Sequence, residues 1–312
     1  MSRSLEIVNF HGIITASAKM KSLFETLKRV SRTDSSVLLR GDSGTGKELF
    51  AQAIHNLSRR RAKPYRALNC ATLSEQLMSS ELFGHVKGAF TGATHQHDGL
   101  FHVVNEGSIF LDEIAEIPLN LQAKLLRVFQ ERAFNRVGST KVEHVNVRFI
   151  SATHTSLRNM VADGTFREDL MYRLRVIPLF LPKLSDRNED IQVLTEKFIE
   201  EFNQLGYRTI EQVSKDAWDA MMSYPWPGNI RELRNNIEHA FAIGLGDTLH
   251  LEDLTPELQG KQPPEETALE NIEKELLVKA LRDNHGNKGK AAEQLGMSRP
   301  TFWRKCKLHN VY

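Results

Sequence analysis

The sequence lacks three features that would set its class at once. It holds only two cysteines in 312 residues, Cys70 and Cys306, which lie far apart and without metal-ligand spacing. This argues against a disulfide framework and fits a reducing compartment. No apolar run approaches the length needed to cross a bilayer, and none follows Met1 as in a signal peptide. We therefore expect a cytoplasmic protein that is neither exported nor membrane-spanning.

The chain also has little net charge. Its formal charge is only +2, so no global field commits the protein to nucleic acid, and any basic surface must be local. Apolar material, in contrast, is ample, because hydrophobic residues make up 40% of the chain. A chain of this length and composition can fill one large or two to three modest cores. We expect a globular protein.

A strand, a glycine-rich turn and a helix are predicted around residues 36–57. The turn reads GDSGTGKE, and its glycines let successive N–H groups converge on an anion at a helix N-terminus. A lysine at the end of such a turn can reach the β and γ phosphates of a nucleotide. The predicted cradle consists of Gly41, Asp42, Ser43, Gly44, Thr45, Gly46, Lys47 and Glu48. The general motif has Ser or Thr in place of Glu48, so a turn that only caps an ordinary helix stays open on spacing alone.

Two carboxylates follow the buried-strand pattern of residues 108–111. Asp112 and Glu113 would stand at the carboxyl end of a strand, which is where open parallel sheets bind their ligands. Asp112 would hold Mg²⁺, and Glu113 would orient or deprotonate the attacking water. Together with the cradle, this pair predicts ATP hydrolysis.

Further strands are predicted over 65–70, 146–153 and 176–181, and amphipathic helices over 19–30 and 119–131. Asn69 and Thr153 lie at polar strand ends. Strands that alternate with helices indicate an α/β fold with a parallel sheet flanked on both faces. The basic run 59–63 is expected to be a solvated helix end, with a phosphate-binding role as the alternative.

Glycine recurs at every fourth position in ELFGHVKGAFTGA, residues 81–93. This spacing predicts either a flexible loop that displays an aromatic tip or tight backbone packing, and both stay open. In FREDLMYRL, residues 166–174, Arg167 and Arg173 are six residues apart on a short helix and so do not share one stripe. Surface ion pairs with the acidic residues between them are the alternative to a functional role.

From residue 190 onward the pattern becomes helical only, with helices predicted over 191–203, 215–223 and 229–243. A rigid turn, YPWPG, precedes the last of these helices, and Arg231 follows in its first turn. This indicates a separate helical subdomain.

The C-terminal residues read as a different module. After a helix over 269–281, residues 288–308 read as helix, tight turn and helix, with Ser298 as N-cap. Residues 281–312 hold seven basic and two acidic side chains, which points to DNA. Base edges would be reached by Arg299, Thr301 and Arg304, and phosphates by Lys290 and Lys305. A basic helical hairpin that only packs on its neighbour is the alternative.

In this order, GDSGTGKE, ELFGHVKGAFTGA, IFLDE, FREDLMYRL and WPGNIREL resemble the AAA+ domain of bacterial enhancer-binding proteins, the activators of sigma-54 RNA polymerase. The C-terminal module resembles their Fis-type DNA-binding domain. The resemblance covers the chain from about Gly12, and GAFTGA is highly specific. In that family Glu normally follows the cradle lysine, so Glu48 fits. The implied domains are an AAA+ α/β subdomain (1–183), a helical lid subdomain (184–258), a linker (259–267) and a Fis-type helix-turn-helix domain (268–312).

The resemblance also implies individual roles. Residues 41–48 would be the Walker A segment, and Asp112 with Glu113 would be Walker B. Asn69 resembles the switch residue that holds the catalytic glutamate away from water. Thr153 sits at the sensor I position, where the next residue, His154, replaces an Asn that many relatives carry.

Other implied roles lie outside the nucleotide cradle. Arg167 and Arg173 match arginine fingers that enter the neighbouring subunit's site, and Arg231 matches sensor II. The sigma-54 contact would be made by Gly88, Ala89, Phe90, Thr91, Gly92 and Ala93. Residues 131–140 resemble a second pore loop beside it.

The implied protein is a DNA-tethered ATPase that uses ATP and Mg²⁺ to remodel the closed promoter complex of the sigma-54 RNA polymerase holoenzyme. It would bind enhancer DNA and form a homo-oligomer, hexameric when active, with a dimer as an option at rest. No room for a receiver, GAF or other sensory domain exists upstream of Gly12, so we expect a naturally short activator restrained by a separate regulatory protein rather than an excised fragment. Two other classes are a non-catalytic DNA-binding regulator and a AAA+ remodeller of replication or protein substrates. Asp112 and Glu113 together with Arg167 and Arg173 weigh against the first, and GAFTGA weighs against the second.

Overall fold

The computed structural model describes residues 6–206, 208–261, 274, 276–284 and 286–309. The chain divides into two compact units, Met1–Asp253 and Leu254–Tyr312. Most of the predicted linker, 259–267, lies outside the described residues. None of the helices in the described part of the chain combines the length and the apolar character that crossing a bilayer requires.

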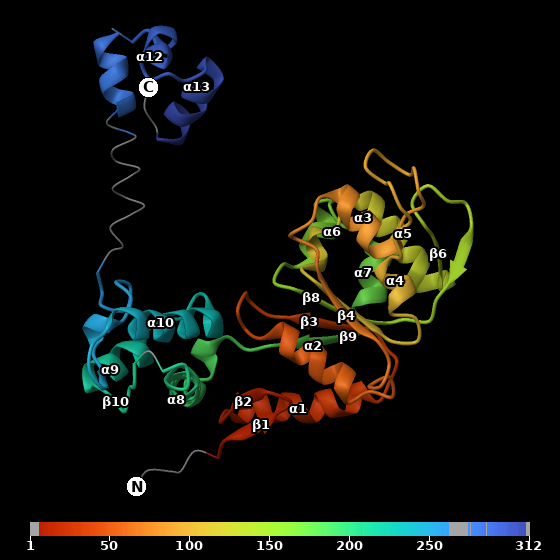
Figure 1. Cartoon of the computed structure of the whole chain (residues 1–312), viewed down its shortest axis with the longest axis horizontal. Coiled ribbons are helices and arrows are strands. Elements are labelled where there is room, and N and C mark those ends of the chain that lie inside the picture. The colour runs from red at the N-terminus through yellow and green to blue at the C-terminus, as the bar shows by residue number, and fades with distance from the viewer. Residues whose placement is uncertain (1–5, 207, 262–273, 275, 285, 310–312) are drawn as a thin grey trace. The chain divides into compact units, whose positions relative to one another are not determined.

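A parallel sheet of five strands forms the centre of the first unit (Figure 1). Its order is β4-β5-β8-β3-β9, and each pairing within it is parallel. The strands are β3 (Val37–Arg40), β4 (Tyr65–Asn69), β5 (Ser108–Asp112), β8 (Arg148–Thr153) and β9 (Ile177–Phe180). All carboxyl ends therefore meet at one edge, and the predicted α/β fold with a parallel sheet is confirmed.

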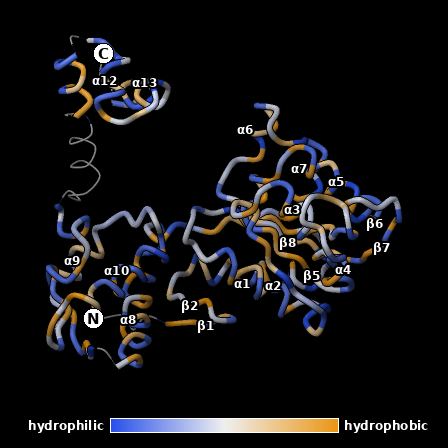
Figure 2. Tube along the Cα trace, turned by 45° about the horizontal axis from the view of Figure 1, so that its top comes forward, coloured by the Kyte–Doolittle hydropathy of each residue, from blue (hydrophilic) through white to orange (hydrophobic). Residues whose placement is uncertain are grey.

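Helices cover both faces of this sheet, because its side chains alternate between two cores. Val37 and Leu39 of β3 join the core on one face, whereas Leu38 joins the core on the other. The first face is covered by α1 (Ala18–Ser31) and α2 (Lys47–Asn56). The second is covered by α3 (Glu75–Phe83), α4 (Leu100–Val103), α5 (Leu119–Glu131), α6 (Leu157–Ala162) and α7 (Glu168–Leu174). Figure 2 shows hydrophobic segments concentrated where the sheet lies between these layers.

Two antiparallel hairpins flank the sheet. β1 (Val8–Phe10) pairs with β2 (Ile13–Thr15), a hairpin that the sequence pattern does not predict. β6 (Ala133–Asn135) pairs with β7 (Val142–His144). The second hairpin contains most of residues 131–140, so the segment that resembles a second pore loop is carried by paired strands.

The helical part of the first unit follows residue 184. It consists of α8 (Glu189–Asn203), α9 (Lys215–Ser223), α10 (Asn229–Ile243) and the short strands β10 (Gln212–Val213) and β11 (Thr248–Leu249). The bounds predicted for α9 and α10 are confirmed. Trp226, in the turn before α10, is 1% exposed and donates its indole N–H to the carbonyl of Met221 at 2.9 Å. This buried anchor fixes where α10 begins.

The second unit is a small helical module. Residues 276–283 are helical, followed by α12 (Lys288–Gln294) and α13 (Arg299–Leu308). The start of the helix predicted over 269–281 lies outside the described residues. Leu277, Ala291 and Phe302 join the three helices in one core. The hydroxyl of Ser298 accepts the N–H of Thr301 at 3.4 Å, which confirms the predicted N-cap.

The basic run 59–63 is only in part the solvated helix end that the sequence predicts. Arg60 is 8% exposed, and its guanidinium donates to Asp34 and to the carbonyl oxygens of Gly107 and Asn146. Its side chain therefore joins three segments at the amino-terminal edge of the sheet. The prediction is wrong for this residue, because a run of like charges does not reveal which member turns inward.

Candidate functional site

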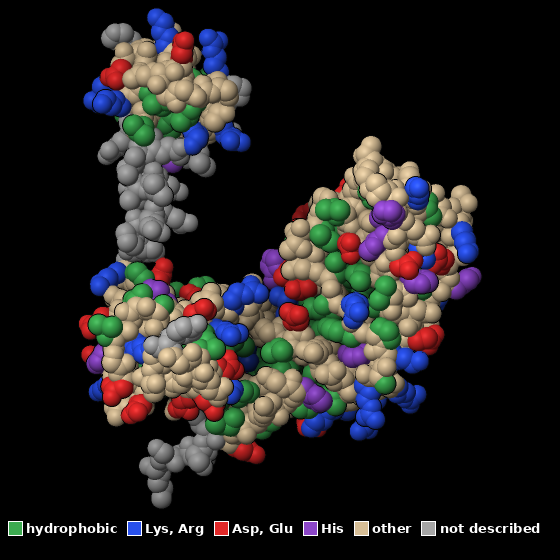
Figure 3. All heavy atoms as spheres, in the orientation of Figure 1, with side chains coloured by type: hydrophobic (Ala, Val, Ile, Leu, Met, Phe, Trp, Pro, Cys, Tyr) green, Lys and Arg blue, Asp and Glu red, His purple; other side chains and the backbone are tan. Residues whose placement is uncertain are grey.

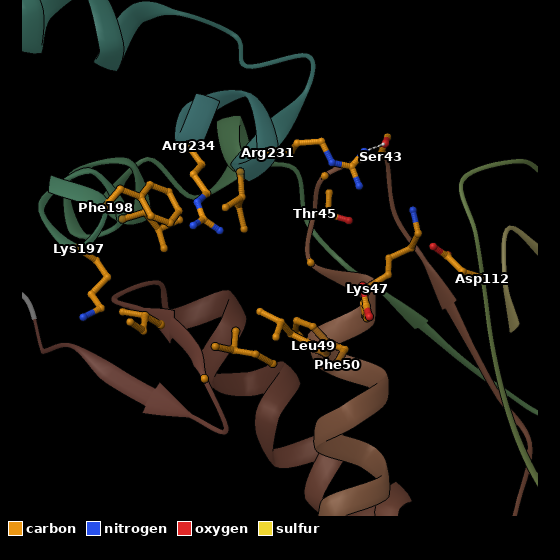
Figure 4. Close-up of a pocket in the computed structure, with 18 of the residues that line it drawn as sticks. Ser43, Thr45, Lys47, Leu49, Phe50, Asp112, Lys197, Phe198, Arg231 and Arg234 are labelled. Atoms are coloured by element: carbon orange, nitrogen blue, oxygen red, sulfur yellow. Dashed lines mark hydrogen bonds between the residues drawn. The ribbon is translucent and has the colours of Figure 1, made fainter. Parts of the chain in front are cut away.

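Three predicted site residues stand at neighbouring strand ends. The last residue of β4, Asn69, is paired in register with Asp112 of β5, and Arg40 of β3 is paired with Thr153 of β8. A cavity of about 580 Å³ opens beside these ends. Residues 43–50, Asn69, Asp112 and Glu113 line it together with side chains from the helical part that follows residue 184 (Figure 4). The sheet thus brings the predicted cradle and the predicted carboxylates to one site.

The glycine-rich turn has the backbone that an anion cradle needs. Gly44 and Gly46 have φ values of 77° and 95°, which place them in the left-handed region, and α2 begins directly after them at Lys47. Lys47 is 7% exposed, and its ammonium group donates to the carbonyl oxygens of Gly41 and Asp42 at 3.0 and 3.2 Å. Phosphate oxygens would offer the same ammonium group stronger, charged acceptors.

The other side chains of the turn make contacts within the turn, with a neighbouring segment, or with the cavity. The hydroxyl of Thr45 donates to the carbonyl oxygen of Asp42 at 2.8 Å. The carboxylate of Asp42 turns to Lys183, at 2.8 Å, and Glu48 is exposed at the wall of the cavity.

Two carboxylates face Lys47 across the cavity. Glu113 Oε1 lies 3.6 Å from Lys47 Nζ, and Figure 4 shows Lys47 and Asp112 pointing toward one another. Burial, and then the charge of Glu113, raise the pKa of Asp112 above its ordinary value. A divalent cation would relieve this repulsion, and carboxylate oxygen is the donor that Mg²⁺ takes. The donor set therefore fits Mg²⁺.

Glu113 is held on its other side by a residue to which the sequence pattern gave no role of its own. Nδ1 of His154 lies 2.8 Å from Oε2 of Glu113. The side-chain oxygen of Asn69 accepts instead the N–H of Ala71 at 2.9 Å. Thr153 is fully buried, and its hydroxyl oxygen accepts the N–H of Thr155 at 3.0 Å.

The lid subdomain, the predicted helical part that starts at residue 184, is fastened directly to the phosphate cradle. Arg231 donates to the hydroxyl of Ser43 at 3.0 Å, which is the contact drawn in Figure 4. The N–H of Ile230 donates to the carbonyl oxygen of Gly44 at 3.0 Å. A Cβ added to Gly44 would lie 2.2 Å from the carbonyl oxygen of Gly228, so only glycine permits this approach. The predicted sensor II residue therefore reaches the cradle.

Sequence reasoning missed two lid residues at this site. Asn229 donates from Nδ2 to the carbonyl oxygen of Ser43, and Arg234 lines the cavity with its guanidinium 5.9 Å from the ring of Phe198. The sequence signal for these residues was the Pro-Gly turn before α10, since it determines which residues form the first turns of that helix.

The two predicted arginine fingers lie away from the cavity of their own chain. Arg167 is the N-cap of α7 and pairs with Asp169 at 2.8 Å, as the surface alternative predicted. Arg173 is exposed in the last turn of α7. Neither is among the described residues that line the cavity.

The glycine-rich segment contains both of the structures that its spacing predicted as alternatives, tight backbone packing and an open loop. A Cβ at Gly84 would lie 2.5 Å from the carbonyl oxygen of His97, so this glycine permits tight packing at the base. Gly88 and Gly92 have φ values of 81° and 100° and no neighbour that a Cβ would meet, so they shape an open loop. Within that loop Thr91 is exposed, and Phe90 packs edge-on against His85 with ring centroids 4.9 Å apart.

Arg136 connects this loop to the β6–β7 hairpin. Its guanidinium pairs with Asp98, which lies just after the loop, and with Glu143 of β7 at 2.6 Å. The N–H of Val137 also donates to the carbonyl oxygen of Gly84 at 2.9 Å. The two segments predicted to act as pore loops are thus bonded to each other.

The second unit carries its cations on exposed helix positions. Lys290 on α12 and Arg299 and Arg304 on α13 are exposed, and Figure 3 shows Lys and Arg side chains around the edge of this unit. Lys305 is half-buried. The hydroxyl of Thr301 lies 2.8 Å from that of Ser298 and so takes part in the cap.

An aromatic side chain missed by the sequence analysis stands among these cations. Trp303 is 58% exposed, and Nζ of Lys288 lies 4.2 Å from its ring. An exposed indole on a basic helix suits contact with nucleic acid.

A glycine-rich phosphate cradle at the mouth of a five-stranded parallel sheet, closed by a helical lid, defines a AAA+ ATPase of the P-loop class. Comparison with known families narrows this class. The model of the sigma-54 interaction domain matches residues 13–180, and that of the AAA+ ATPase lid domain matches residues 185–271. The model of bacterial regulatory proteins of the Fis family matches residues 268–307.

Curated relatives match over nearly the whole chain. The regulatory protein AtoC of Escherichia coli is 42% identical over 96% of this chain and 68% of its own length. The nitrogen fixation protein VnfA of Azotobacter vinelandii is 45% identical over 96% of this chain and 59% of its own length. NtrX from Brucella abortus, solved in complex with ADP, is 36% identical with a TM-score of 0.73, covering 96% of this chain and 70% of that one. The chain belongs to the sigma-54-interacting AAA+ family of transcription activators.

Proposed function

We propose that this chain activates transcription by hydrolysing ATP within a ring of identical subunits and by using the 88–93 loop to remodel sigma-54 RNA polymerase at the closed promoter complex. The second unit would hold the ring on enhancer DNA through α13. A ring of six subunits is the expected active form. The local reaction is attack of water on the γ-phosphorus, with cleavage of the bond to the bridging oxygen and loss of the water proton to Glu113.

Each site residue has a defined part in this proposal. Lys47 and the N–H groups of the cradle would bind the β and γ phosphates, and Asp112 would hold Mg²⁺. The bound ion would neutralise charge that develops on the phosphate oxygens. Glu113 would take the proton of the water, and Arg231 would report to the lid which nucleotide is present.

The positions of Arg167, the N-cap of α7, and of Arg173 in the last turn of α7 support this proposal. Arg167 and Arg173 are exposed, and neither lines the cavity of its own chain within the described residues. A positive charge from α7 would therefore have to reach the γ-phosphate of a neighbouring subunit. Such an arginine accelerates phosphoryl transfer about 10³- to 10⁵-fold, which corresponds to an activation free energy lower by roughly 4 to 7 kcal/mol.

Mixed assemblies test this directly. Arg173→Ala and Lys47→Ala subunits should each be inactive alone, since the first lacks the finger and the second lacks the cradle lysine. When they are mixed, Lys47→Ala subunits can donate Arg173 to the intact cradles, and ATPase activity should return. Arg158→Ala, an exposed change on α6, is the matched control and should keep full activity. Absence of rescue would count against an arginine supplied by the neighbour.

A further inference from the structure

His154 makes the contact that decides where the catalytic carboxylate points. Its Nδ1 lies 2.8 Å from Oε2 of Glu113, and its backbone N–H donates to the same oxygen at 3.4 Å. The other carboxylate oxygen, Oε1, lies 3.6 Å from Nζ of Lys47. Glu113 is therefore held between the lysine of the cradle and the residue that directly follows β8.

The sheet explains why these two residues meet. β5 and β8 are parallel neighbours in which Leu111 lies opposite Ser151, so the residues that follow Asp112 and Thr153 leave the sheet within one residue of each other. Glu113 has φ 48° and ψ 52°, a left-handed conformation that costs a residue with a Cβ about 1 kcal/mol. Its side chain is only 16% exposed, whereas that of His154 is 52% exposed. The strained backbone directs the carboxylate inward, and the imidazole meets it from the more solvated side.

The hydrogen bond has one direction. As the base, Glu113 can only accept in this contact, so Nδ1 of His154 carries the hydrogen of the bond. Asn69, which by resemblance would hold the glutamate, has its own side-chain oxygen bonded to the N–H of Ala71. Within the described residues, the hydrogen bonds to the carboxylate of Glu113 come from His154.

We propose that His154 is a positioning residue for ATP hydrolysis, and that its Nδ1–H keeps the carboxylate of Glu113 aimed at the attacking water. This inference rests on the proposed function of Glu113 as the base. When phosphates bind, Lys47 turns to them, because they are more highly charged acceptors than one carboxylate. Glu113 then loses its contact with Lys47 and retains His154. A carboxylate has about four acceptor sites, so the two hydrogen bonds from His154 leave room for the water.

Three substitutions of His154 distinguish the effect of its side-chain hydrogen-bond donor from the effect of the volume of its imidazole. In asparagine, Nδ2 is bonded to Cγ, as Nδ1 is in histidine, so His154→Asn retains a donor in nearly the same place. In His154→Gln the side-chain donor lies one bond further out, and in His154→Ala only the backbone N–H remains. We expect His154→Asn to stay within about 3-fold of the parent kcat, and the Gln and Ala variants to lose roughly 10- to 100-fold, as for a misplaced catalytic group. KM should not change in any of them.

Binding of a fluorescent ATP analogue supplies a second readout. All three variants should bind it as tightly as the parent, because Lys47, Asp112 and the lid contacts are intact. Parent-like kcat in the Ala and Gln variants would overturn the inference. So would an equal loss in His154→Asn and His154→Ala, a higher kcat in His154→Ala, or a change confined to KM.

Glu113→Gln in the same assay separates this inference from the proposed function. If that variant keeps parental turnover, Glu113 is not the base and the proposed function itself fails. If it loses turnover while His154→Ala and His154→Gln do not, only the positioning role fails. Should His154→Ala lack a cooperative unfolding transition, the comparison of Asn with Gln still decides the question, since both keep an amide of similar size.

Discussion

The side chain of Asn229 donates a hydrogen bond to the carbonyl oxygen of Ser43 at 2.9 Å and so joins the first residue of α10 to the phosphate cradle. Its own side-chain oxygen accepts the N–H of Leu184 at 2.9 Å, and the residue is 1% exposed. A buried amide with both ends bonded leaves unsatisfied partners when it is removed. The shape of the cradle therefore depends on a residue of the lid.

Asn229→Gly should lower the free energy of unfolding by about 1 to 3 kcal/mol, because buried partners lose their hydrogen bonds. Nucleotide binding should weaken in parallel. Gly is preferred to Ala here, since φ is 52°, a left-handed conformation that Gly and Asn tolerate better than Ala does. Urea unfolding and nucleotide titration measure the two effects. Asn235→Ala, an exposed change on the same helix, should stay within about 0.5 kcal/mol of the parent. Equal stability of Asn229→Gly and the parent would show that the lid contact is dispensable.

The Arg136–Glu143 pair predicts a pH dependence of stability. The hydrogen bond from Arg136 holds the pKa of Glu143 below its usual 4.5. Because the folded pKa is the lower one, the stabilisation is complete above pH 4.5 and is lost as the pH falls through the folded value. Arg136→Gln should therefore lower the Tm at pH 7, and its difference from the parent should shrink below pH 4.5.

The matched control for this experiment is Arg127→Gln. Arg127 pairs with Glu131 at 2.7 Å, but both side chains are about half exposed, and such pairs contribute little. Its Tm difference from the parent should be small at each pH. A difference for Arg136→Gln that is unchanged at low pH would assign the effect to packing rather than to the ion pair.

Thr91→Ala should separate ATP hydrolysis from contact with sigma-54. Thr91 is exposed in the open part of the loop, so its loss should leave folding and ATPase turnover unchanged. Binding to sigma-54, measured with a transition-state analogue of ATP bound, should weaken about tenfold or more, equivalent to ~1.4 kcal/mol. Thr94→Ala, an exposed change just beyond the loop, should bind as the parent does. Parental affinity in Thr91→Ala would remove the loop tip from the contact.

Two cations of the second unit should differ in their effect on DNA binding. Arg304→Ala on α13 should cost about 1 to 3 kcal/mol and relax preference at one position of the operator, as loss of a base contact does. Lys290→Ala on α12 should weaken binding to all sequences and lower the salt dependence by about one charge. Quantitative footprinting at several salt concentrations distinguishes them. An equal loss of affinity for all sequences in both variants would show that Arg304 contacts the DNA phosphates rather than a base.

Regular elements of this fold follow from local sequence. α5, α9, α10 and α13 begin and end at the predicted residues, because apolar periodicity and turn residues are properties of one segment. The carboxyl ends of β4, β5 and β8 were also found, since each strand ends at a polar residue. Position at a strand end was sufficient to bring Asn69, Asp112 and Glu113 to one cavity.

Contacts between distant segments could not be predicted in this way. His154 meets Glu113 across 41 residues, and Asn229 meets Ser43 across 186. Arg60 appeared to belong to a solvated basic run, yet its partner Asn146 is 86 residues away. Each of these polar side chains turns inward only because another segment supplies its partner, which no local pattern records.

In the proposed function the ATPase site becomes complete only between subunits, and turnover as a function of protein concentration shows whether it does. ATPase activity per subunit should be measured across a dilution series in which mass photometry reports the assembly at each concentration. We predict that activity per subunit falls as the assembly dissociates and that the isolated monomer is nearly inactive. Constant activity per subunit down to concentrations where only monomer is present would show that one subunit carries a complete site.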